Sequence, residues 1–162
     1  MEKLKTTIRL SVKSLAIISF LLTKVHAQDL DKHQVENAVH TKEFVFKAQT
    51  VMPMSGGSKQ LTTEYDVKFL GDSIVSYLPY FGRAYNASYG SSDGGINFTS
   101  TKFDYKAKAG KKGAWNITVK PNDVKDIQEM NFTISENGSA SLNVTSHNRQ
   151  PISFYGHIIK PK

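Results

Sequence analysis

The chain has 162 residues, of which 39% are hydrophobic, and it carries a formal net charge of +7 and no cysteine. This length suits one domain with its own core, and the missing cysteine excludes disulfides, thiolate metal sites, a cysteine nucleophile and a lipid-modified N-terminal cysteine. The charge does not indicate nucleic-acid binding, because most of the excess lies in the first 27 residues, outside the predicted domain.

Residues 1–27 have the pattern of a cleaved secretion signal. Basic residues come first, an apolar stretch runs from Leu15 to Leu22, and Val25-His26-Ala27 fits a signal-peptidase site. The apolar stretch is far shorter than the roughly 20 residues that span a bilayer, so we predict no integral membrane span after cleavage. The segment holds five of the 21 Lys and Arg and one of the 14 Asp and Glu, which leaves 16 positive and 13 negative side chains and a net charge of +3. We therefore predict one β-rich domain over residues 28–162, located in the periplasm or secreted.

The predicted domain opens with a short amphipathic helix between Asp29 and Lys42. Apolar residues recur there at helical spacing, and Asp29 or Asp31 is available as the N-cap. From Phe44 to Ile159 the period changes to two, which is typical of half-buried strands. Breaks rich in Gly, Pro and Asn divide this region into about eight antiparallel strands.

The predicted fold class is therefore all-β, with a short N-terminal helix and a mainly meandering sheet that is barrel-like, a half-barrel or a sandwich. Alternation alone does not decide between these three closures. An outer-membrane barrel is disfavoured, because no continuous lipid-facing band flanked by two aromatic girdles can be drawn on the strands.

The parity of the apolar positions predicts the register of three hairpins. Their loops are Gly71-Asp72, Gly110-Lys111-Lys112, and Glu136-Asn137-Gly138 with its glycine in the left-handed conformation. The predicted pairs are Phe69 with Ile74, Tyr105 with Ile117, and Phe132 with Leu142. A change of phase also predicts a bulge or bend between Thr99 and Lys102.

The most specific stretch of the chain runs from Tyr77 to Tyr85 and reads Y-L-P-Y-F-G-R-A-Y. It holds four aromatic rings, a proline, a glycine and an arginine within nine residues. So many aromatic side chains are costly to leave in water, so the run is expected to line a core, a groove or an interface.

Several segments together resemble the domain of unknown function family 4251. They are Phe44-Val45-Phe46-Lys47-Ala48, Leu61-Thr62-Thr63-Glu64-Tyr65, the run Tyr77 to Tyr85, Gly94-Gly95-Ile96-Asn97-Phe98, Trp115-Asn116-Ile117, and Asn148 to Gly156. The resemblance implies an exported envelope protein of Bacteroidetes-type bacteria, and it implies no activity. Many relatives resemble lipoproteins, whereas this chain lacks the cysteine for such an anchor. Asp72-Ser73-Ile74 also resembles the short O-glycosylation sites of such bacteria, although an ordinary turn explains it as well.

Five residues form the candidate ligand or structural site: Tyr80, Phe81, Arg83, Tyr85 and Arg149. Arg83 and Arg149 are the only arginines of residues 28–162, against 14 lysines, and both lie in the two most distinctive motifs. One interpretation is that Arg83, Tyr80 and Phe81 hold an anionic or sugar-like ligand, since a guanidinium offers a planar fork that lysine lacks. The other is that an arginine stacks on a ring and bridges to a carboxylate, which fixes a loop.

No catalytic motif, metal-ligand spacing or cofactor-binding motif is visible in the sequence, so we predict no catalytic residues, no metal and no cofactor. The sequence favours a non-enzymatic binding or interaction domain of the cell envelope, with a small ligand or an envelope protein as its partner and no nucleic acid. The alternative is a purely structural or assembly protein. A hydrolytic function needs an acidic pocket beside His147 or His157. An empty cavity inside the sheet would favour ligand binding, and a filled core would favour the structural alternative.

Overall fold

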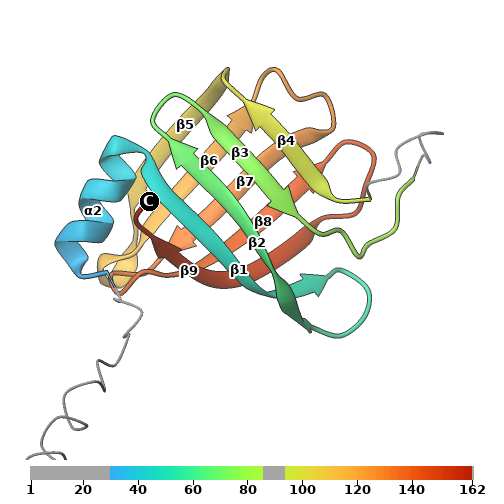
Figure 1. The fold of residues 1–162 in the computed structure, drawn as a ribbon, viewed down its shortest axis with the longest axis horizontal. Coiled ribbons are helices and arrows are strands. Elements are labelled where there is room, and N and C mark those ends of the chain that lie inside the picture. The colour runs from blue at the N-terminus through green and yellow to red at the C-terminus, as the bar shows by residue number, and fades with distance from the viewer. Residues whose placement is uncertain (1–29, 86–93, 162) are drawn as a thin grey trace, which may run out of the picture.

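The structure, a computed structural model, describes residues 30–85 and 94–161, so the predicted signal segment 1–27 lies outside the described residues. Within them, nine antiparallel strands form one sheet that curls into a nearly closed barrel, with a helix at one end (Figure 1). The elements are α2 (Lys32–Thr41), β1 (Glu43–Pro53), β2 (Lys59–Leu70), β3 (Ile74–Leu78), β4 (Ile96–Ser100), β5 (Phe103–Ala109), the 3₁₀ turn η1 (Lys111–Gly113), β6 (Trp115–Pro121), β7 (Ile127–Ile134), β8 (Ser139–Ser146) and β9 (Ile152–Ile159). The predicted all-β class and N-terminal helix are confirmed, with nine strands in place of about eight.

The sheet is a meander whose first and last strands also pair. The spatial order is β4-β3-β2-β1-β9-β8-β7-β6-β5, so β1 and β9 lie at the centre and the consecutive strands β4 and β5 lie at the two edges. Each neighbouring pair is antiparallel, including β1 with β9. This arrangement brings the aromatic run after β3 close to the segment before β9.

Two of the three predicted hairpin registers are confirmed. Phe69 pairs with Ile74 across a two-residue loop, in which Gly71 has a φ of +77° and the Leu70 N–H donates to the Ser73 carbonyl. Phe132 pairs with Leu142 across the loop that ends at Gly138, whose φ is +83°. The Asp72-Ser73-Ile74 motif forms the first of these turns.

The predicted register at the β5–β6 hairpin is wrong by two residues. Tyr105 pairs with Val119 and not with Ile117. The loop has five residues, 110–114, because Lys112 and Gly113 both take positive φ and the Gly110 N–H donates to the Ala114 carbonyl. Loops of three and five residues leave the same side chains on the inner face, so parity did not distinguish them.

The predicted bend between Thr99 and Lys102 joins the two edges of the sheet. The Asp123 carboxylate accepts hydrogen bonds from the Ser100 hydroxyl and from the N–H groups of Thr101, at 2.9 Å, and Lys102, at 3.2 Å. These bonds, that of Ser100 first, lower the pKa of Asp123 below its ordinary value. The carboxylate thereby fixes the direction change between β4 and β5.

Helix α2 covers one end of the barrel (Figure 1). Asp31 is its N-cap and forms a capping box with Gln34, which satisfies backbone N–H groups at the helix start. Val35, Ala38 and Val39 are buried against the core. The Tyr105 hydroxyl donates to the Val39 carbonyl at 2.9 Å, which ties the helix to β5.

Aromatic rings fill the interior of the sheet. Phe132 is 1% exposed, and its ring contacts those of Phe44, Phe46 and Phe69 at centroid distances of 6.3, 5.7 and 5.4 Å. Leu, Ile and Val side chains surround this cluster. Because side chains occupy the middle of the barrel, a ligand has to be sought on its outer surface and loops.

Candidate functional site

Two segments that are far apart in the sequence lie side by side at one corner of the sheet. Residues 80–85, here called the aromatic loop, follow β3, and Arg149 precedes β9. An isolated β-bridge joins Ala84 to Arg149, the Gln150 N–H donates to the Arg83 carbonyl at 3.1 Å, and the Tyr85 N–H donates to the Asn148 carbonyl at 2.8 Å. The fold therefore brings the two arginine motifs of the sequence together.

Tyr80 is the inner residue of the aromatic loop. Its ring is half-buried against the core, and its hydroxyl lies 2.9 Å from the Arg83 carbonyl and 3.0 Å from the Gln150 carbonyl. A side chain at Gly82 would clash with the Tyr80 hydroxyl, which its own hydrogen bonds hold in place, so glycine suits the close passage of the loop over the ring. Burial raises the pKa of Tyr80, so the hydroxyl stays protonated and able to donate at neutral pH.

Arg149 holds three parts of the chain with one side chain. Its guanidinium lies over the Tyr80 ring at 5.2 Å, and its Nε is 3.2 Å from a carboxylate oxygen of Asp126. Its Nη1 donates to the carbonyls of Gly94, at 3.1 Å, and Gly95, at 2.9 Å, directly before β4. A planar fork with several N–H groups can make these contacts at once, and a lysine ammonium cannot.

We expect Arg149→Lys to lower the free energy of unfolding by about 2 kcal/mol, because charge-assisted hydrogen bonds and the ring contact are lost at a side chain that is only 19% exposed. The matched control is Arg83→Lys, whose exposed side chain should change stability by less than about 0.5 kcal/mol. Urea unfolding of both variants measures the difference. Equal losses, or no loss in Arg149→Lys, would contradict the assignment of Arg149 as the corner's anchor.

The other three residues of the candidate site face solvent. Phe81 is 43% exposed and Tyr85 65% exposed, and Arg83 is exposed between them. The Lys59 ammonium lies 4.7 Å from the Phe81 ring centroid, within cation–π range. The five residues therefore divide into an inner pair, Tyr80 and Arg149, that fixes the backbone, and an outer trio that the backbone presents to solvent.

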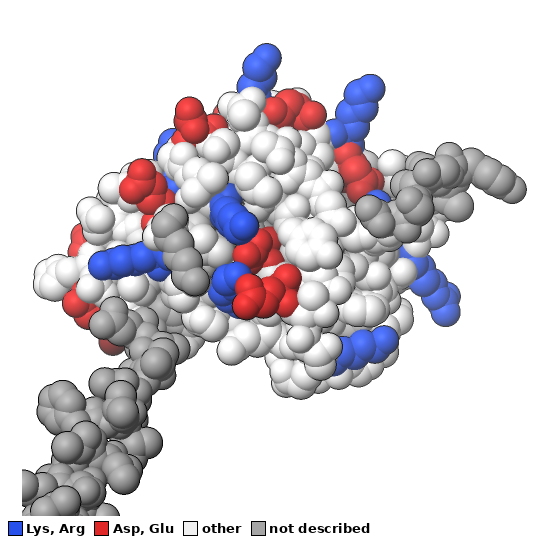
Figure 2. Space-filling view, viewed as in Figure 1, with Lys and Arg blue, Asp and Glu red and all other residues white. Residues whose placement is uncertain are grey.

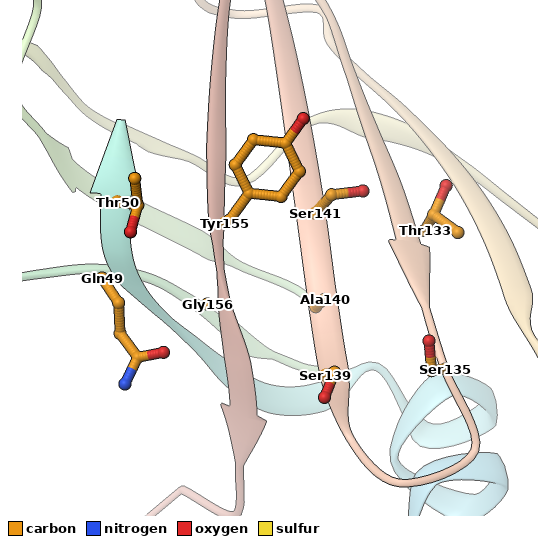
Figure 3. A pocket seen from close by; sticks show the side chains of 9 residues that line it. All are labelled: Gln49, Thr50, Thr133, Ser135, Ser139, Ala140, Ser141, Tyr155 and Gly156. Carbon is orange, nitrogen blue, oxygen red and sulfur yellow. The ribbon is translucent and has the colours of Figure 1, made fainter. Parts of the chain in front are cut away.

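A second feature, absent from the sequence-based site, is a cleft of about 420 Å³ on the outer face of β1, β9, β8 and β7 (Figure 3). Tyr155 stands between Thr50 and Ser141, and Gly156 adds no side chain to the floor. All of its lining residues are uncharged: Gln49, Thr50, Thr133, Ser135, Ser139, Ala140, Ser141, Tyr155 and Gly156.

This cleft was not among the sites that the sequence predicted. The hollow lies beside a register shift between Ala48 and Thr50, where Gln49 has no partner in either neighbouring strand. A bulge of this kind has no clear signature in alternation. An aromatic residue at the outward position 155, among serines and threonines, was the one available signal.

Two further properties concern the described ranges, residues 30–85 and 94–161. Within them, His, Asp and Glu side chains form no group of three that could hold a metal ion. None of the helices in those ranges has the length and apolar composition needed to cross a membrane. Acidic and basic side chains are interspersed on the face shown in Figure 2, without a large patch of one sign.

Comparisons with known proteins support the resemblance noted in the sequence. A family model described as "Domain of unknown function (DUF4251)" matches residues 27–158. The crystal structure of a DUF4251 family protein from Bacteroides eggerthii is similar, with a TM-score of 0.59 and 18% identity over 83% of this chain and 90% of that chain. At this identity the likeness shows the fold alone. No curated protein matches the chain.

Proposed function

The chain belongs to the DUF4251 family, which is defined without a function, and we propose that it is a non-enzymatic interaction domain of the bacterial cell envelope. The aromatic loop binds another envelope protein through Phe81, Arg83 and Tyr85. The signal-like pattern of residues 1–27 supports export to the periplasm or beyond.

The observation that carries this proposal is the exposure of two aromatic rings on a loop that is held rigidly from behind. Four backbone or hydroxyl contacts fix residues 80–85, and the Arg149 guanidinium lies over the Tyr80 ring, as described above. A loop that is ordered before binding loses little conformational entropy when a partner docks. Tyr and Arg are also the side chains that dominate binding energy in protein interfaces.

Charge at the aromatic loop indicates the chemistry of the partner. Lys59 lies over the Phe81 ring, and Arg83 is exposed two residues further along the chain. The acidic Asp126 is already paired with Arg149. A partner surface that combines apolar and acidic side chains matches this arrangement.

Site-specific photo-crosslinking in the native host tests the proposal. A benzophenone amino acid in place of Phe81 or Tyr85 is expected to form a covalent adduct with the same envelope protein, and one in place of Tyr155, an equally exposed ring on another face, is not. Arg83→Glu should reduce the adduct yield about tenfold, because it opposes the acidic partner. The proposal fails if positions 81 and 85 give no adduct, or if all three positions give the same adducts.

The alternative function, a purely structural or assembly protein of the envelope, is favoured by two observations. The interior of the barrel is packed with aromatic rings, and Arg149 serves to hold chain segments together. This alternative requires the fold but not the exposed rings. A protein that carries both Phe81→Ser and Tyr85→Ser should then replace the wild-type protein in the host without a change in phenotype. The interaction proposal instead requires that this double variant fails to replace it.

A further inference from the structure

We infer that the outer-face cleft around Tyr155 is a binding site for an uncharged saccharide. This site is independent of the aromatic loop, and neither the family nor the similar structure assigns it. The inference rests on the register of the strands, on the bulge in β1 and on the chemistry of the lining side chains.

Strand register places the lining residues in one row across the sheet. Thr50 pairs with Tyr155, Tyr155 with Ser141, and Ser141 with Thr133. The neighbouring residues Phe154, Leu142 and Phe132 are buried, so the row occupies the alternate, outward positions. Four strands therefore present hydroxyl groups side by side on one flat surface.

A bulge at Gln49 borders the hollow in this surface. On the floor of the cleft Gly156 pairs with both Ala48 and Ala140, whose methyl groups belong to the core, so the floor at this position is backbone. Gln49, the unpaired residue, lines the rim with an amide group. A small ligand can thus rest on backbone while polar side chains surround it (Figure 3).

The polar groups of the cleft are available for a ligand. In the part of the chain that the structure describes, the hydrogen bonds made by lining side chains are those of Thr133 to Asn116 and of Thr50 to Gln60. The hydroxyls of Ser139, Ser141 and Tyr155 are not engaged by protein side chains within these ranges. They supply donors and acceptors at adjacent positions.

The absence of charge among the lining residues selects the ligand class. An anion or a cation would find no countercharge there. Lys47, a cation on the same strand as Gln49 and Thr50, has its Nζ held by Asp66 at 2.9 Å and Glu64 at 3.2 Å. A lipid tail would leave the hydroxyls without partners.

A neutral sugar satisfies both kinds of surface. Its ring carries one apolar face of C–H groups, which can stack on the Tyr155 ring, and its hydroxyls can pair with the serine and threonine hydroxyls. Tyr155 is 44% exposed, so its ring is open to such stacking. The cleft volume of about 420 Å³ lies within the range of about 300–1,000 Å³ that is typical of small-molecule sites.

The test is a titration of the ¹⁵N-labelled domain with maltose, cellobiose and diacetylchitobiose, monitored by amide chemical shifts. Because the cleft is open, we expect a dissociation constant on the order of 1 mM for at least one of these disaccharides. The shifted amides should be those of Ser139, Ser141 and Gly156. Tyr155→Ala should weaken binding about tenfold, through loss of the stacking surface.

Two controls make the titration decisive. Tyr77→Ala removes an exposed tyrosine of β3, outside the cleft, and should leave the affinity unchanged. Glucuronate, a charged sugar, should bind more weakly than the neutral disaccharides. The inference is overturned if none of the three disaccharides shifts the cleft amides at concentrations on the order of 10 mM. It is equally overturned if binding survives Tyr155→Ala, or if an uncharged peptide binds the cleft and the sugars do not.

Discussion

Replacement of Phe132 by alanine is expected to lower the free energy of unfolding by about 3–5 kcal/mol, the largest loss for any single truncation considered for this fold. The ring is 1% exposed and contacts three other phenylalanine rings, so its removal leaves a cavity bordered by groups from both halves of the sheet. For a domain of this size the loss corresponds to a fall in melting temperature of about 15 °C.

The packing origin of this loss can be separated from simple loss of an aromatic group. Phe132→Leu retains most of the volume and should cost less than about 1.5 kcal/mol. Tyr155→Ala removes an exposed ring and should be nearly neutral. Calorimetry and urea unfolding of the three variants should therefore rank them in this order, and a loss below 1 kcal/mol in Phe132→Ala would show that the ring cluster does not hold the barrel together.

Gly156→Ala is expected to destabilise the domain by about 3 kcal/mol or to prevent folding, because strand β1 passes too closely for any side chain at this position. An added Cβ would lie 1.8 Å from the Lys47 carbonyl oxygen and 3.2 Å from the Ala48 Cα. Both contacts are backbone atoms, which cannot turn away as a flexible side chain could. The clash would fall on the only seam that joins β1–β4 to β5–β9 within the described sheet.

A second glycine provides the control for this substitution. Gly57 lies in the β1–β2 connection, and an added Cβ there would meet no atom within 4 Å. Gly57→Ala should therefore leave the unfolding midpoint unchanged or raise it slightly, by lowering the entropy of the unfolded chain. If Gly156→Ala does fold, faster amide hydrogen exchange in β1 and β9 than in β7 would locate the damage at the seam. Equal midpoints for the two glycine variants would contradict the close approach.

The sequence predicted those parts of the fold that depend on local alternation and turn chemistry. Asp31 and the apolar spacing located the helix, and Gly71 and Gly138 located two hairpins with the correct register. In each case one residue type is strongly preferred at one backbone geometry. In each case the sequence of one segment was therefore enough to predict its structure.

The features that sequence reasoning missed depend on choices that alternation does not distinguish. The five-residue loop at 110–114 leaves the same faces inward as a three-residue loop, and the bulge at Gln49 adds one residue that the pattern does not mark. The pairing of β1 with β9 joins segments about one hundred positions apart. Such contacts are decided by packing in three dimensions, so the cleft built on them was not predicted.

The candidate site was predicted as a set of residues but not as an arrangement. Arg83 and Arg149 were predicted together because they are the only arginines of residues 28–162. In the structure, however, Arg83 is exposed to solvent, whereas Arg149 contacts three chain segments. Side-chain type alone does not show which of two arginines has a carboxylate and a ring within reach. The partners Asp126 and Gly95 become visible only once the strands are assembled.

The position of β5 at one edge of the sheet bears on whether the protein associates with itself at high concentration. Within the described sheet this strand has one neighbour, β6, so its other side has backbone groups that could template the strand of a second molecule. Lys106 and Lys108 lie on this strand, and Lys102 directly precedes it. Two copies approaching edge to edge would bring these lysines together, so we expect charge repulsion to disfavour pairing of β5 with a second molecule.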